Sequence, residues 1–117
     1  MGLILNTRRV NGHIIVEVSG RLEFGDGLEQ LRELTRRLTS DGSNAFILDM
    51  SGISHMDSSG LGLLLSIYAT IRNQGGDLKL LNAGNRVREL LRITGLASIF
   101  QMFEDESQAI RAKSHNA

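Results

Sequence analysis

Two serines follow an aspartate where a strand-like run gives way to an apolar, helix-like run. The segment reads Met56-Asp57-Ser58-Ser59-Gly60-Leu61-Gly62. The start of a helix gathers unpaired backbone N–H groups and the positive end of the helix dipole, so it tolerates negative charge. A serine in this place can act as a helix cap, as a nucleophile or as an acceptor of a phosphoryl group.

The helix cap is better assigned to Asp57 than to Ser58. With Asp57 as the cap, Met56 precedes the cap and Leu61 is the fourth helical residue, so the two can pack as a hydrophobic staple. A cap at Ser58 would put the carboxylate of Asp57 at the staple position, to which it is poorly suited. The sequence therefore predicts that Ser58 opens the helix with a partly exposed hydroxyl that is not used for capping.

Catalysis by Ser58 is not favoured. The nucleophile elbow of serine hydrolases reads G-x-S-x-G, and Met56 stands at the first glycine. The downstream histidine, His115, is close to the end of the chain and is a poor candidate for a general base. A dinucleotide-binding glycine motif would need a third glycine where Leu65 stands. We expect no enzymatic activity, and from the residues alone a plain structural serine and a phosphorylated serine both remain open for Ser58.

A strip of small side chains runs along the helix predicted over Ser58–Asn73. At 100° per residue, the strip consists of Ser59, Gly62, Ser66, Ala69 and Asn73. The rest of this helix is almost entirely apolar. A strip of small residues lets another surface approach the helix backbone closely, and both a partner protein and a neighbouring helix of the same domain remain candidates for that surface.

The composition excludes several classes of function. Thirteen basic residues balance thirteen acidic ones in a chain of 117 residues, so there is no basic excess for nucleic acid or anionic lipid. The chain has no cysteine, and its three histidines have no metal-binding spacing. The longest apolar-rich run, Leu61–Ile71, is too short to span a bilayer. We expect a cytoplasmic protein without metal, cofactor, nucleic-acid partner or membrane partner.

The elements that must position the serine motif are read from periodicity and turn residues. The predicted strands are Leu3–Val10, His13–Ser19, Ala45–Met50, Leu78–Leu81 and Ile99–Phe103. The predicted helices are Leu28–Leu38, Ser58–Asn73, the run from Asn85 to Gly95, and Asp105–Ala112. The loops that flank the motif in this scheme are Arg21–Gly27 and Ser51–His55. Asn11-Gly12 joins the first two strands as a hairpin.

Strands that alternate with helices after an opening hairpin predict an α/β domain with a mixed sheet. In this context the motif resembles that of the STAS domain of bacterial anti-sigma-factor antagonists. Val18–Glu23 resembles the second strand of that family and its G-x-L-D/E turn. Asn82-Ala83 and Thr94-Gly95-Leu96 resemble its C-terminal half.

The resemblance covers residues 3–112. It implies a single STAS-like domain over 3–112, with a mixed sheet of about five strands, an opening antiparallel hairpin and about four helices. Residues 113–117 are expected to form a loose tail.

The resemblance also implies a partner switch. In that family the unmodified antagonist binds an anti-sigma factor that is also a serine kinase, and this releases the sigma factor. The kinase phosphorylates the serine after the motif aspartate, which ends the complex, and a metal-dependent serine phosphatase resets it. Carried over, the phosphoacceptor is Ser58. The implied partner-binding residues are Glu23, Asp57, Ser58, Ser59, Gly60, Leu61, Gly62 and Ser66.

Two points stay open at this stage. Glu23 stands where the family often has aspartate, and its extra methylene changes where the carboxylate lies, so its role is not fixed by the resemblance. The alternative function within the same fold is a STAS module that does not switch and serves as a scaffold in a larger signalling or transport complex.

Overall fold

A mixed sheet organises residues 2–113, the residues that the computed structural model describes. The strand order in this part of the chain is β1-β2-β3-β4-β5; β1 pairs antiparallel with β2, and the other pairs are parallel. The strands are β1 Ile4–Val10, β2 His13–Leu22, β3 Ala45–Met56, β4 Asp77–Leu81 and β5 Met102–Phe103. The helices are α1 Asp26–Ser40, α2 Ser58–Asn73, α3 Asn85–Ile93 and α4 Glu106–Arg111. The predicted α/β architecture is confirmed.

The opening hairpin forms as the sequence predicts. Asn11 and Gly12 have φ values of 49° and 81°, the left-handed conformation that a two-residue hairpin turn of type I′ requires at both positions. Val10 and His13 pair on either side of the turn.

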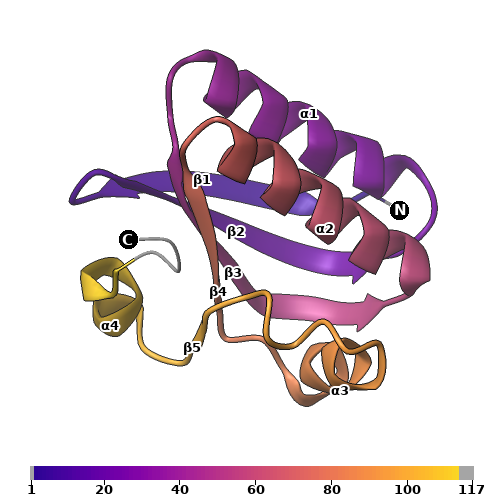
Figure 1. Ribbon diagram of the computed structural model, residues 1–117. Coiled ribbons are helices and arrows are strands. Elements are labelled where there is room, and N and C mark those ends of the chain that lie inside the picture. The colour runs from indigo at the N-terminus through magenta and orange to yellow at the C-terminus, as the bar shows by residue number, and fades with distance from the viewer. Residues whose placement is uncertain (1, 114–117) are drawn as a thin grey trace.

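The helices cover the two faces of the sheet unequally. Helices α1 and α2 lie side by side on one face, and α4 lies on the other (Figure 1). Successive residues of β3 point to opposite faces. Phe46 and Leu48 therefore join the main core, whereas Ile47 joins a smaller core that includes Ala109 of α4. The central strand is buried on both faces, as its apolar run predicts.

Strands β2 and β3 are longer than the sequence predicts. They continue to Leu22 and Met56, so Ser51–His55 is paired strand and the prediction of a loop there is wrong. The side chains of this stretch are mostly polar and do not alternate with apolar ones, so the sequence pattern did not indicate a strand. The backbone hydrogen bonds that pair the strands do not depend on these side chains. Glycine at position 52 lets the two strands approach closely, because a Cβ there would lie 2.3 Å from Oγ of Ser19. Because β3 extends to Met56, the serine motif that follows it lies beside the end of β2.

Strand β5 is shorter than the predicted run Ile99–Phe103. It is limited to Met102–Phe103 because the chain turns before it, where the N–H of Ile99 donates to the carbonyl of Leu96 at 3.1 Å. The predicted tail lies outside the described residues except for Lys113, whose carbonyl accepts a hydrogen bond from Nε2 of Gln101 at 3.0 Å.

Candidate functional site

Asp57 caps α2, as predicted. Its Oδ1 accepts a hydrogen bond from the backbone N–H of Gly60 at 2.9 Å. Met56 and Leu61 are both buried in the main core, where a hydrophobic staple places them. Ser58 is the first residue of the helix, and its side chain is exposed. The hydroxyl of Ser58 is therefore accessible.

The second oxygen of Asp57 holds a loop from another part of the chain. Oδ2 accepts a hydrogen bond from the backbone N–H of Phe24 at 3.1 Å. The backbone N–H of Asp57 donates to the carbonyl of Leu22 at 3.3 Å. One residue thus ties the start of α2 to the segment between β2 and α1.

These contacts make Asp57 a stable anion. The backbone N–H of Gly60 lowers the pKa of its carboxyl group most, and the N–H groups of Phe24 and Ser59 and the nearby His55 lower it further. Burial acts in the opposite direction but does not outweigh them. Hydrogen bonds to a carboxylate favour its charged form. Asp57 therefore stays ionised well below neutral pH.

The two glycines of the motif have different surroundings. A Cβ on Gly60 would lie 2.1 Å from the backbone oxygen of Leu22, so the first turn of α2 packs directly on the end of β2. A Cβ on Gly62 would meet no atom within 4 Å. Gly60 is needed for packing inside the domain, whereas Gly62 keeps a part of the outer surface flat.

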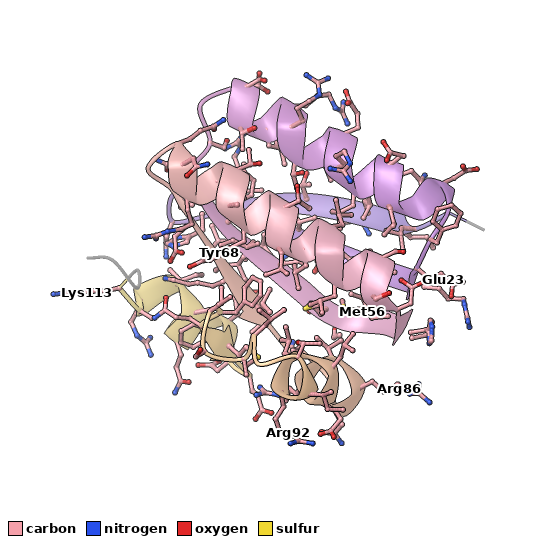
Figure 2. All side chains as sticks on the ribbon, turned by 45° about the vertical axis from the view of Figure 1, so that its right-hand side comes forward. Glu23, Met56, Tyr68, Arg86, Arg92 and Lys113 are labelled. Atoms are coloured by element: carbon pink, nitrogen blue, oxygen red, sulfur yellow. The ribbon has the colours of Figure 1, made fainter. Side chains whose placement is uncertain are left out.

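Glu23 takes part in a small polar cluster beside Asp57. Nε of Arg21 donates to Oε1 of Glu23 at 2.8 Å, and Nε2 of His55 lies 3.5 Å from Oε2. The hydrogen bond from Arg21 is the main cause of the lowered pKa of Glu23, and the charge of His55 contributes. Figure 2 shows Glu23 and Met56 at the same end of the molecule, by the start of α2. The carboxylate of Glu23 is thus held in place beside the motif.

The strip of small residues faces outward. Gly62, Ser66, Ala69 and Asn73 are exposed, and Ser59 is half-buried. Ser66 also borders a groove of about 290 Å³ between α1 and α2. This exposure favours the first of the two candidate roles, a surface open to a partner, over burial against a neighbouring helix.

The structure brings most of the predicted site residues to one end of the sheet. Glu23, Asp57, Ser58 and Ser59 lie together there, and Gly62 and Ser66 follow along α2. Gly60 and Leu61 are buried beneath this surface. The sequence analysis missed the contribution of Phe24, whose one available signal was an aromatic residue in a polar loop.

Two other kinds of feature are absent from the described residues. In residues 2–113, no group of three or more histidine, aspartate or glutamate side chains is placed to hold a metal ion. No helix in the same part of the chain has the length and apolar character needed to cross a membrane.

Comparison with known proteins assigns the chain to a family. The model of the STAS domain matches residues 5–109. The chain belongs to the STAS domain family. The STAS-like fold expected from the sequence is therefore confirmed.

Among similar STAS proteins, the anti-sigma-B factor antagonist of Bacillus subtilis (strain 168) is 30% identical over 102 residues, which are 87% of this chain and 92% of that protein. The Bacillus cell fate determinant SpoIIAA, solved in its phosphorylated form, is 26% identical with a TM-score of 0.73, over 92% of this chain and 96% of that chain. The STAS fold also occurs within the murine anion transporter Slc26a9, which is 25% identical with a TM-score of 0.75 over 88% of this chain but 18% of that chain.

Proposed function

We propose that this STAS domain is an anti-sigma-factor antagonist that is switched by phosphorylation of Ser58. In the unmodified state it binds an anti-sigma factor with serine kinase activity, and the bound sigma factor is released. Phosphorylation of Ser58 ends the complex, and a metal-dependent serine phosphatase restores the unmodified chain. The proposal rests above all on one observation: Ser58 is the exposed first residue of α2, while Asp57 supplies the cap.

The relatives support the antagonist role. The Bacillus subtilis relative is named an anti-sigma-B factor antagonist, and the two proteins match over nearly their whole lengths. SpoIIAA, which has the same fold, exists in a phosphorylated form. These proteins are named as regulators, which agrees with the expectation that this chain is not an enzyme.

The chemistry of the switch requires only a hydroxyl from this chain. Oγ of Ser58 forms a bond to the γ-phosphorus of ATP, the bond to the bridging oxygen breaks, ADP leaves, and the kinase accepts the serine proton. The phosphoserine adds about two negative charges at the N-terminus of α2, where backbone N–H groups tolerate them. The fold is kept, but charge now accumulates beside the ionised carboxylates of Asp57 and Glu23.

Loss of binding then follows from repulsion and poor fit at the interface. Ser58, Ser59, Gly62 and Ser66 are accessible enough for a partner to contact them directly, and Glu23 lies beside them. The buried Gly60 and Leu61 and the capping Asp57 act by holding this surface in shape. A phosphate on Ser58 would project into the middle of the contact area.

A capture experiment tests the proposal. The chain and its Ser58→Asp and Ser58→Ala variants are used to recover partners from a lysate of the source cells. We expect a serine kinase of ATPase fold with the unsubstituted chain and with Ser58→Ala, but not with Ser58→Asp. In a second step, the recovered kinase and ATP should place phosphate on the unsubstituted chain and on Ser59→Ala, but not on Ser58→Ala. Equal recovery by all three chains would overturn the switch.

The second candidate is a STAS scaffold that does not switch. The likeness to a domain of the transporter Slc26a9 is the observation that favours it. Under this alternative, one partner would bind the unsubstituted chain and the Ser58→Asp variant with the same affinity. The capture experiment therefore separates the two functions.

A further inference from the structure

Phe24 exposes more of its surface than any other large hydrophobic side chain in residues 2–113. Phe24 is 84% exposed, whereas Phe46 and Phe100 are 2% and 3% exposed. Single exposed apolar residues are common, so exposure alone assigns no role to Phe24. What distinguishes Phe24 is the way its backbone is held.

The backbone around Phe24 is fixed on three sides. Its own N–H donates to Oδ2 of Asp57 at 3.1 Å. Before it, Leu22 is fully buried in the main core. After it, the carbonyl of Gly25 accepts from the N–H of Leu28 at 3.2 Å, in the first turn of α1. Gly25 itself has a φ of 137°, which only glycine adopts without strain. The loop thus presents the ring to solvent from a fixed position, which reduces the entropy lost on binding.

The same carboxylate links Phe24 to the phosphorylation site. Asp57 binds the N–H of Phe24 with one oxygen and caps the helix that Ser58 opens with the other. The backbone of Phe24 and the start of α2 therefore lie on either side of one carboxylate. A partner that covers the hydroxyl of Ser58 would lie close to the backbone of Phe24.

Charged residues adjoin Phe24 in the chain. Glu23 is its neighbour in the chain and pairs with Arg21 and His55. Exposed aromatic side chains that extend from a fixed backbone beside charged residues are common among interface hot spots, where a few side chains supply most of the binding free energy.

We propose that Phe24 is the apolar anchor of the Ser58 interface, and that the anti-sigma-factor kinase receives its ring in an apolar pocket. This inference rests on the proposed function and deepens it by naming the chemistry of the partner's surface. It also assigns a determinant of partner choice, because a related kinase without such a pocket would bind this chain weakly.

The test measures the affinity of the recovered, purified kinase for the full chain and for matched variants. Ile4→Ala is the control, because Ile4 is also well exposed at 65%. Ile4 lies on the face of β1 opposite to α1, since its neighbours Leu3 and Leu5 belong to the main core. We expect Phe24→Ala to weaken binding about thirtyfold, Phe24→Leu to retain most of the affinity, and Ile4→Ala to change it less than about twofold.

The outcomes separate the inference from the proposed function. If Ser58→Asp weakens binding but Phe24→Ala binds like Ile4→Ala, the anchor is wrong and the switch stands. If Ser58→Asp binds like the unsubstituted chain, the proposed switch is wrong, and the proposed anchor at the Ser58 interface is rejected as well. If Phe24→Ala lowers the melting temperature, the affinity of Phe24→Leu is the deciding measurement. Retention of most of the affinity by Phe24→Leu supports an apolar anchor, and a large loss of affinity contradicts one. An effect of Phe24→Ala only on self-association of the chain, seen by sedimentation, also overturns the inference.

Discussion

Oδ2 of Asp57 accepts a hydrogen bond from the backbone N–H of Phe24 at 3.1 Å, across 33 positions of the chain. The other oxygen of the same carboxylate caps α2. One side chain therefore fixes both the helix start and the loop that flank Ser58. Because Ser58 carries neither of these contacts, its modification is expected to change binding while the fold persists.

Loss of the Asp57 carboxylate should destabilise the domain. Removal of a helix cap costs about 1–2 kcal/mol, and the lost bond to the N–H of Phe24 adds about 1 kcal/mol. We expect Asp57→Ala to lower the free energy of unfolding in urea by about 2–3 kcal/mol. Asp105→Ala is the control, because Asp105 caps only the short α4 through a longer bond of 3.3 Å. An equal effect of the two substitutions would contradict the double role of Asp57.

The two motif glycines should respond in opposite directions to alanine. In Gly60→Ala the new methyl group meets the backbone of Leu22, which cannot easily move, so stability should fall by about 1–3 kcal/mol. In Gly62→Ala the methyl group enters open space, and the gain in helix propensity should stabilise α2 by up to about 1 kcal/mol. Thermal unfolding of both variants checks the pair.

The outward position of Gly62 gives a second, separate readout. A methyl group there would stand in the strip of small residues along α2, so Gly62→Ala should weaken partner binding while it stabilises the fold. Unchanged affinity of this variant would show that the strip around Gly62 is not contacted.

A negative charge at Ser58 should leave stability almost unchanged. The charge stands at the positive end of the α2 dipole, so Ser58→Asp should shift the free energy of unfolding by no more than about 0.5 kcal/mol. The melting temperature measured by circular dichroism checks this. A large decrease would mean that modification acts through unfolding and would contradict a switch at the interface.

The lowered pKa of Asp57 links stability to pH. Its folded-state pKa lies below the ordinary value, so the unfolded state binds more protons in acid, and the contribution of Asp57 is lost as pH falls through the folded-state pKa. This contribution is fully present well above the ordinary aspartate pKa of about 3.9 and is lost only at more acidic pH. Urea titrations from neutral pH down into this acidic range should show a smaller loss of stability for Asp57→Asn. An identical loss in both chains would contradict the role of the carboxylate.

Local signals predicted the helix that carries the site, and contacts between distant residues limited the rest. The staple of Met56 and Leu61 and the cap at Asp57 lie within six positions, so the sequence located the start of α2 correctly. The paired strand at Ser51–His55 escaped prediction because its polar side chains give no alternation. The bond between Asp57 and Phe24 joins residues far apart in the chain, and only the packing of α2 on β2 creates it.

The most direct measurement compares the affinity of the serine kinase partner for the unmodified chain and for the chain phosphorylated on Ser58, with the modified residue mapped by mass spectrometry. The predicted result is one phosphate, on Ser58, with binding weakened at least about tenfold and an unchanged melting temperature. Phosphate on Ser59 instead of Ser58, or equal affinity of the two forms, would show that Ser58 is not the switch.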